Sequence, residues 1–319
     1  MPSSRDILSR HAETLQGRLK LRWLQSRALG LRKSYYVYEP PGLDRHAALP
    51  AVYLFRGHER EWVNIGEDAS RQHSTAIEDL DRAIAAGDLP PMLAVMPGLT
   101  STNNHVPSLG VDMVGPMAGR PEGLGEGRFW RYLNDELFSR IGCDYPQTSG
   151  GIRLAAGFSL GGYTVSLLAI HRPGFFAHAA MYDALFMWPG HRDPREDGKG
   201  LTDPIWRDSP LFDAALGSPR DADALRRWNP TDTLKRADEQ RLRELGKTTF
   251  WIASAGADGQ QGNRDRTRFF GRLVRNKGLR LGFDTLVFDS EARHDWHWTD
   301  RFLIRFLRGA LVDGASHPG

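Results

Sequence analysis

The chain has 319 residues, of which 40% are hydrophobic, so it can bury a large core, and we expect a single domain spanning residues 1–319. Its 42 basic residues are offset by 39 acidic ones without a long basic run, which argues against a nucleic-acid partner. No apolar run approaches about 18 residues, and the N-terminus lacks the apolar middle region of a secretory signal. The single cysteine, Cys143, excludes an internal disulfide, and together these features predict a cytoplasmic protein.

The first half of the chain predicts one helix followed by several strands. Apolar spacing indicates an N-terminal helix within residues 1–16, and alternation in 19–25 and 32–38 indicates an antiparallel hairpin. The elements expected next are strand 49–55, helix 74–86 with Ser74 as its N-cap, strand 92–96 and helix 128–141. Residues 99–127 are rich in glycine, proline and asparagine, and a connection of this length is typical of a functional loop.

The second half alternates strands and helices with one interruption. Residues 187–229 are rich in proline, glycine, aspartate and tryptophan and predict a cap-like insertion, while 312–319 form a tail. The regular elements expected are strand 152–156, helix 160–171, strand 178–182, helix 231–245, strand 247–254, helix 264–277, strand 281–288 and helix 298–311. The pattern predicts an α/β fold, with a mostly parallel central sheet, an N-terminal antiparallel hairpin and helices on both faces.

A five-residue motif lies between strand 152–156 and helix 160–171. Gly157-Phe158-Ser159-Leu160-Gly161 fits G-x-S-x-G, in which a strand turns sharply into a helix and exposes a serine hydroxyl. Side chains at 157 and 161 would collide with the neighbouring strand and helix, so glycine is needed at both positions. The motif predicts Ser159 as a nucleophile, and the alternative is a tight glycine turn with an ordinary surface serine.

A serine nucleophile needs a base, and an acid to orient that base, in the chain order Ser, acid, His. His294 lies between the last predicted strand and the last helix, and we prefer it to His297, which falls at the helix start. For the acid we expect Asp258, directly after strand 247–254. The alternatives are Asp265, near a helix start, and Asp289, on a different connection.

Acyl transfer also needs backbone donors for the developing oxyanion. We expect one donor to be the N–H of Leu160, which follows the nucleophile. The second is expected in the loop after strand 49–55, where Gly57 allows a turn and the N–H of His58 follows. No set of histidines and carboxylates has metal-ligand spacing, and no glycine-rich phosphate loop follows a strand, so we expect neither metal nor cofactor.

The motif Gly157–Gly162, together with Arg56-Gly57, Gly256-Ala257-Asp258 and Arg293–Trp296 in this order, resembles the esterase family of α/β-hydrolases. That family includes esterase D (S-formylglutathione hydrolase), feruloyl esterases, the enterochelin esterase catalytic domain and the mycobacterial mycolyltransferases. The resemblance extends from about residue 18 to 311. It implies a metal-free serine esterase for a small-molecule ester, with Ser159, Asp258 and His294 as its triad.

Two residues depart from the family pattern. Arg56 stands where the family usually has histidine before the glycine, and Arg293 precedes His294 where glycine is frequent. Arg56 either brings a cation near the acyl pocket or pairs with Glu59 or Glu61. Other candidates for substrate contact, with packing under loops as the alternative, are Trp62, Asn103, Asn104, His105, Trp130, Trp188 and Trp206.

The sequence leaves three functions open. The first is carboxylic ester hydrolysis. The second is acyl transfer to another acceptor, or peptide hydrolysis, by the same triad. The third is a catalytically silent binding protein on the same fold, because a fold does not fix a function. The acyl group and the oligomeric state are not indicated by any residue.

Overall fold

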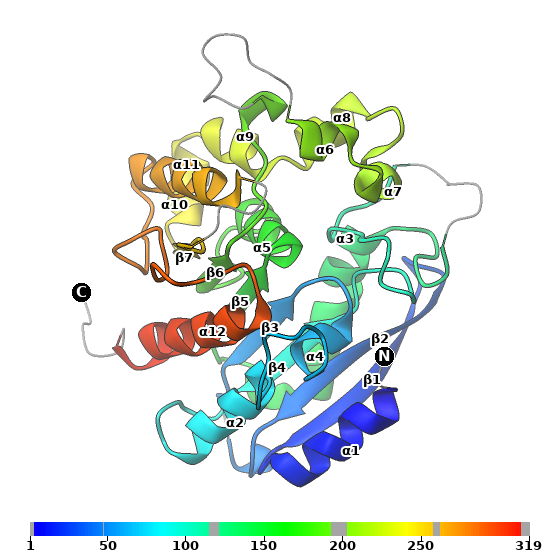
Figure 1. Ribbon diagram of the computed structural model, residues 1–319, viewed down its shortest axis with the longest axis vertical. Coiled ribbons are helices and arrows are strands. Elements are labelled where there is room, and N and C mark those ends of the chain that lie inside the picture. The colour runs from blue at the N-terminus through cyan, green and yellow to red at the C-terminus, as the bar shows by residue number, and fades with distance from the viewer. Residues whose placement is uncertain (1–2, 47, 115–120, 193–202, 258–261, 314–319) are drawn as a thin grey trace.

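The computed structural model describes residues 3–46, 48–114, 121–192, 203–257 and 262–313. Its strands form one seven-stranded sheet in the order β1-β2-β4-β3-β5-β6-β7 (Figure 1). The strands are β1 (Arg18–Ser26), β2 (Leu31–Glu39), β3 (Ala51–Phe55), β4 (Leu93–Pro97), β5 (Arg153–Phe158), β6 (His178–Tyr182) and β7 (Thr249–Ala253). β1 and β2 form an antiparallel hairpin, β2 pairs antiparallel with β4, and the remaining pairs are parallel. The mostly parallel sheet with a leading hairpin is confirmed.

The register of the parallel strands brings several chain segments to one edge of the sheet. Phe55 at the end of β3 is level with Gly157 in β5. Phe158 is level with Tyr182, which is level with Ala253. Because all four strands run in the same direction, the loops that follow them emerge side by side. This edge therefore collects the residues after β3, β5, β6 and β7, where open α/β sheets place their ligand sites.

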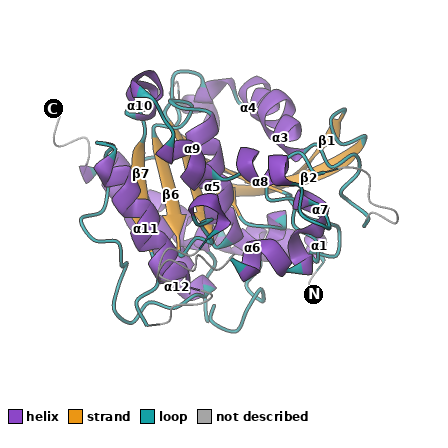
Figure 2. Cartoon of the chain, turned by 90° about the horizontal axis from the view of Figure 1, so that it is seen from above, coloured by secondary structure: helices purple, strands orange, loops and turns teal. Residues whose placement is uncertain are grey.

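Helices cover both faces of the sheet (Figure 2), because successive strand residues point to opposite sides. On one side Val52 and Leu54 pack with the helices α1 (Ser4–Thr14), α2 (Ala76–Ala85) and α12 (Trp296–Leu311). On the other side Tyr53 and Phe55 pack with the residues of α3 (Phe129–Arg131), a π-helical segment (Tyr132–Leu137), α4 (Phe138–Asp144), α5 (Leu160–His171), α9 (Pro230–Lys235), α10 (Glu239–Leu245) and α11 (Asn263–Asn276). The layered α/β arrangement matches the expected one.

Three short helices follow β6 and lie above α5 in Figure 1: α6 (Pro204–Asp208), α7 (Asp213–Leu216) and α8 (Ala222–Arg227). Their apolar side chains form a separate cluster with residues of the long loop and of α5. Trp206, which is fully buried, lies against the ring of Tyr163 with 4.9 Å between centroids. The segment thus covers the part of α5 that begins directly after Ser159.

Some predicted elements differ from the observed ones. The strand expected over 281–288 is reduced to two isolated bridges, Phe250 with Leu281 and Ser254 with Val287. Between these bridges the ring of Trp251 lies so close to Gly282 that a Cβ there would be 2.2 Å from it, and the segment bends instead of pairing. The N-cap of α2 is Thr75, not Ser74. Within the described ranges, no helix combines the length and apolar character needed to cross a membrane.

Candidate active site

Ser159 occupies a strained turn between β5 and α5. Its φ is 55° and its ψ is −115°, a left-handed conformation that is uncommon for a residue with a side chain. Backbone hydrogen bonds hold the turn in place: the N–H of Ser159 donates to Tyr182 O at 3.1 Å, and the N–H of Leu185 donates to Ser159 O at 3.3 Å. The nucleophile candidate is therefore fixed to the segment that leaves β6.

The two glycines of the motif are required by close backbone contacts. A Cβ on Gly157 would lie 2.2 Å from Gly161 O, and one on Gly161 would lie 1.9 Å from Phe55 O at the end of β3. Both distances are far below a van der Waals contact, and both neighbours are backbone atoms. The steric reason given for glycine at these positions is confirmed.

The imidazole of His294 is paired with Asp183. Nδ1 of His294 lies 2.6 Å from Oδ2 of Asp183, which is the first residue after β6. The ring of Phe158, directly before Ser159, lies against the same imidazole with 4.6 Å between centroids. The base candidate thus contacts a carboxylate on one side and the residue preceding the nucleophile on another.

Asp183 is held rigidly in a fully buried position. Its Oδ1 accepts the N–H of Ala255 at 3.0 Å, and its backbone N–H donates to Ala253 O at 2.8 Å. The amide of Asn263, at the start of α11, donates to Asp183 O at 2.9 Å and lies 3.3 Å from Oδ2. An ionised aspartate only accepts hydrogen bonds, so Nδ1 of His294 donates and its Nε2 keeps the lone pair that a general base needs.

This geometry offers Asp183, where the sequence predicted Asp258. Asp258 lies outside the described residues, and Nδ1 of His294 already has a carboxylate partner. The alternatives are placed elsewhere: Asp289 accepts from Glu291 N, and Asp265 is in the first turn of α11. The sequence carried a signal for Asp183 as a further candidate, because it directly follows the predicted strand 178–182.

The loop that carries His294 is fixed on both sides. The hydroxyl of Tyr182 donates to Arg293 O at 2.6 Å, and burial raises the pKa of this phenol, so it stays protonated. Asp295 then caps α12 by accepting from Trp298 N at 3.0 Å. His297, the alternative base, is exposed in the first turn of α12, and its backbone N–H donates a hydrogen bond to Ser70 Oγ. His294 is the histidine that contacts the carboxylate.

The two expected oxyanion donors differ in whether a protein group already accepts their hydrogen bond. Leu160 is the first residue of α5, so its N–H has no acceptor within the helix and points from the positive end of the helix dipole. The N–H of His58 instead donates to Oε2 of Glu61 at 2.6 Å, and the N–H of Gly57 donates to the same oxygen at 2.8 Å. A carboxylate therefore occupies the second donor in this structure.

The remaining candidates for substrate contact divide into buried and exposed side chains. Trp62 is buried and packs edge-on against Trp296, with centroids 5.1 Å apart, and Trp188 is buried against Phe269 at 5.5 Å. Both fit the packing alternative. His105 is exposed in the long loop. Trp206 is also buried, Asn104 Oδ1 faces Gly57, and Trp130 is half-buried beside Trp228.

Arg56 lies beside the site with its guanidinium over the ring of Phe158, 5.2 Å from the centroid. Its Nε is 3.9 Å from Oε1 of Glu61, so of the two carboxylates considered it approaches Glu61. Glu59 instead lies 3.0 Å from Nδ1 of His58. The charge of Arg56 is thus partly balanced by the carboxylate that caps the second oxyanion donor.

Arg71 connects the two loops of the site and was not singled out from the sequence. Its fully buried guanidinium forms two bonds of 2.8 Å to Asp300 in α12. It also donates to Glu61 O at 2.5 Å and to Asn64 O at 2.9 Å, and it stacks over Trp296 at 4.2 Å. The loop after β3 is therefore tied to the helix that follows His294. No local motif marks such a residue.

Among the residues with a described position, no group of three histidine, cysteine or acidic side chains gathers as a metal site would require. The polar groups that converge at the sheet edge are a serine, a histidine, a buried carboxylate and a helix N-terminus. These are the groups that acyl transfer uses.

Comparison with known proteins agrees with this chemistry. The family model Esterase, described as "Putative esterase", matches residues 26–308. A ferulic acid esterase superposes with a TM-score of 0.68 at 19% identity, over 93% of this chain and 98% of its own. An S-formylglutathione hydrolase from Agrobacterium tumefaciens has a TM-score of 0.62 at 18% identity, over 93% and 95%.

The fluorophosphonate-binding serine hydrolase FphF of Staphylococcus aureus has a TM-score of 0.61 at 16% identity, over 92% of this chain and 98% of its own. No curated protein matches the sequence. At these identities, the solved structures establish a shared fold, which is that of the α/β-hydrolases.

Proposed function

The chain belongs to the esterase family and is a carboxylic ester hydrolase; on that premise we propose that it works through an acyl-enzyme formed on Ser159. In this proposal His294 is the general base and Asp183 the acid that orients it. The observation that carries the assignment is the 2.6 Å contact between His294 Nδ1 and Asp183 Oδ2 at the sheet edge where Ser159 turns into α5.

The reaction would proceed in two halves. His294 Nε2 takes the proton of Ser159 as its oxygen attacks the ester carbonyl, and buried Asp183 stabilises the imidazolium that forms. The tetrahedral intermediate collapses when His294 gives the proton to the leaving alcohol, and an acyl-serine remains. In the second half, His294 takes a proton from a water molecule as the water attacks the acyl-serine. The carboxylic acid product leaves when His294 returns that proton to the oxygen of Ser159.

We assign the first oxyanion donor to the N–H of Leu160 and the second to the N–H of His58. The second assignment requires Glu61 to leave the position in which it accepts from His58 and Gly57. A negative carboxylate there would repel the developing oxyanion, so its displacement would belong to substrate binding.

The segment 187–229 is proposed as a cap that shapes the acyl pocket within a single domain. Its described part covers α5, and the buried pair Arg266–Asp203 ties it to α11 with a 2.9 Å bond between Nη2 and Oδ1. The substrate class proposed is a small-molecule ester. The cytoplasmic location and the lack of a nucleic-acid partner stay predictions from the sequence.

The test is a panel of p-nitrophenyl and aryl esters with a fluorophosphonate label. The parent protein should release p-nitrophenol and take up the label, and Ser159→Ala should do neither. Ser166→Ala is the matched control. Ser166 is buried on α5, and its hydroxyl donates a hydrogen bond to Tyr163 O. A parent with no turnover and no labelling would favour the silent binding protein.

The alternative of acyl transfer or peptide hydrolysis uses the same residues, so the acceptor decides between them. The experiment uses an ester that the protein hydrolyses and adds alcohols as competing acyl acceptors. If the enzyme is an esterase, water should remain the preferred acceptor. Formation of a new ester in preference to acid, or faster cleavage of peptides than of esters, would assign the second function.

A further inference from the structure

Four arginines follow one face of α11. Arg264, Arg268, Arg272 and Arg275 are all exposed, at spacings of four, four and three residues. With 3.6 residues per turn, these positions lie within one narrow stripe along the helix. The opposite face buries Phe270 and Val274. In the sequence the stripe is hidden among intervening residues, and only the helical winding aligns it.

A groove runs between this arginine stripe and residues 284–287. It has a volume of about 420 Å³ and is lined by the four arginines and by Asp284, Thr285, Leu286 and Val287. The second wall is fixed in place, because Leu286 O accepts from Ser254 N at 3.0 Å. Leu286 also packs so closely on Gly271 that a Cβ there would be 2.4 Å from it.

Few acidic side chains of the described residues lie beside the arginine stripe. Across the described parts of the chain, none of the four arginines is in a salt bridge. Two of them contact backbone carbonyls instead: Arg264 Nη1 lies 3.3 Å from Gly256 O, and Arg275 Nη2 lies 3.5 Å from Asp284 O. Among the described residues that line the groove, Asp284 is the one acidic residue.

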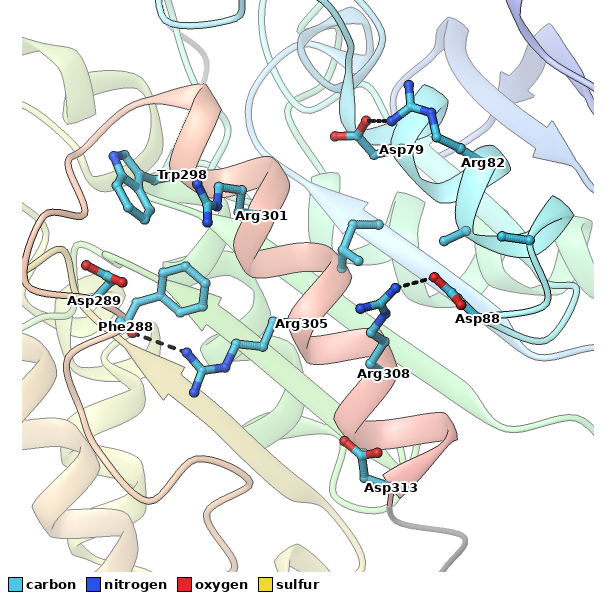
Figure 3. A pocket seen from close by; sticks show the side chains of 13 residues that line it. Asp79, Arg82, Asp88, Phe288, Asp289, Trp298, Arg301, Arg305, Arg308 and Asp313 are labelled. Atoms are coloured by element: carbon cyan, nitrogen blue, oxygen red, sulfur yellow. Dashed lines mark hydrogen bonds and ion pairs between the residues drawn. The ribbon is translucent and has the colours of Figure 1, made fainter.

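A second hollow, of about 660 Å³ between α2 and α12, shows the contrast (Figure 3). There two of the four lining arginines are in ion pairs, Arg82 with Asp79 at 2.9 Å and Arg308 with Asp88. Arg305 instead donates to Phe288 O, and Arg301 lies over the ring of Trp298. Asp289 and Asp313 line the same hollow. Among the described lining residues, the groove on α11 thus has one aspartate for four arginines, whereas the second hollow has four aspartates for four arginines.

We propose that the arginine stripe binds a linear polyanion, an acidic polysaccharide. Successive arginines at i and i+4 are about 6 Å apart along the axis, and the whole stripe extends about 17 Å, which suits an extended chain carrying a charge on successive units. The proposal goes beyond hydrolysis at Ser159 and does not depend on it.

The lining favours this occupant over two other polyanionic surfaces. A single-stranded nucleic acid is held by aromatic side chains on which bases stack, and none of the described residues that line the groove is aromatic. A membrane surface is bound by exposed apolar groups beside the cations, and the large exposed apolar side chains found in the described residues, at 23, 152, 211 and 312, lie outside the groove lining.

The stripe leads toward the candidate active site. Arg264, at its N-terminal end, contacts Gly256 O, and the N–H groups of Gly256 and Ala257 both donate to Ala292 O at 3.0 Å. Ala292 is two residues before His294. A polymer bound along α11 would therefore extend to the loop that carries the base, so an ester on that polymer would approach the site.

The test is fluorescence anisotropy with labelled polygalacturonate at low ionic strength. The parent should bind, and the triple variant Arg264→Gln, Arg268→Gln and Arg272→Gln should bind at least about tenfold more weakly with a smaller salt dependence, because fewer counterions are released. The control is Arg5→Gln, Arg27→Gln and Arg32→Gln, which removes the same charge from exposed positions on α1, in the β1–β2 turn and on β2, and should bind as the parent does.

Neutral dextran should not compete. Equal weakening in the two triple variants, or none in the stripe variant, overturns the proposal, and so does preferential displacement of the probe by a single-stranded oligonucleotide or by anionic vesicles. Hydrolysis of p-nitrophenyl acetate by the stripe variant should equal that of the parent. This separate readout distinguishes a failure of the polymer site from a failure of the esterase assignment.

Discussion

Nδ1 of His294 lies 2.6 Å from Oδ2 of Asp183, across 111 positions of sequence. Asp183 follows β6, whereas the carboxylate expected from the chain order, Asp258, follows β7. The buried carboxylate also accepts from Ala255 N, so the residue after β7 supports the acid from the backbone. The carboxylate beside His294 thus follows β6, which is the neighbour of β5, the strand that leads to Ser159.

The first prediction concerns this carboxylate. Asp183→Asn should lower kcat roughly 10³- to 10⁴-fold, because an amide no longer holds the imidazole in the tautomer with a free Nε2. Asp258→Asn is the matched variant and should leave kcat near the parent value. Steady-state kinetics on one p-nitrophenyl ester measures both. If Asp258→Asn loses activity while Asp183→Asn retains it, the catalytic acid is Asp258, and the assignment of Asp183 is wrong.

The second prediction concerns the capped oxyanion donor. Glu61→Gln should raise kcat/KM, since a neutral amide is displaced from the N–H groups of Gly57 and His58 more easily than a charged carboxylate. The thermal midpoint should fall at the same time, because charge-assisted bonds within the loop are weakened. A lower kcat/KM at an unchanged Tm would mean that Glu61 supports the reaction where it stands.

The third prediction concerns the close contact beneath the serine. Gly161→Ala should destabilise the fold by about 1–3 kcal/mol or more, because its Cβ would meet the carbonyl of Phe55 at 1.9 Å and the backbone must shift. Gly142→Ala in α4 is the control, as nothing lies within 4 Å of its added Cβ. Urea unfolding should show a gain of about 0.5–1 kcal/mol for the control, from the better helix propensity of alanine.

The fourth prediction concerns Lys33 in β2, whose Nζ donates to Thr100 O at 2.6 Å and to Gly123 O at 2.9 Å. Burial lowers the pKa of this lysine to about 8, partly opposed by Glu59. Between about pH 8 and 10 the unfolded chain keeps a proton that the folded chain has released. The free energy of unfolding should therefore rise with pH in this window, by at most about 3 kcal/mol in total.

Denaturant unfolding at pH 7.5 to about 9.5 measures this slope. Lys33→Met should be less stable overall, because two buried carbonyls lose their donor, but it should lack the rise. Lys235→Met removes an exposed lysine and should follow the parent. A parent stability that stays flat or falls through this window, or an undiminished rise in Lys33→Met, would contradict the assignment.

The sequence alone determined the features that depend on short-range pattern. The motif around Ser159 and the strand and helix that flank it followed from local periodicity and steric rules, and the family resemblance was confirmed. His294 was predicted as the base from its place before the last helix, although the strand expected in front of it is reduced to two isolated bridges. These are properties of residues close together in the chain, where backbone sterics act directly.

Tertiary structure decided the partners. The register of β6 against β5 brings Asp183 beside the turn at Ser159, and the hydroxyl of Tyr182 holds the loop of His294 there by donating to Arg293 O. Glu61 on the second oxyanion donor and Arg71 between two loops are side-chain choices that depend on burial and on residues far along the chain. The arginines of α11 form one surface because the helix winds them together. Such juxtapositions depend on strand register and packing, which no local pattern encodes.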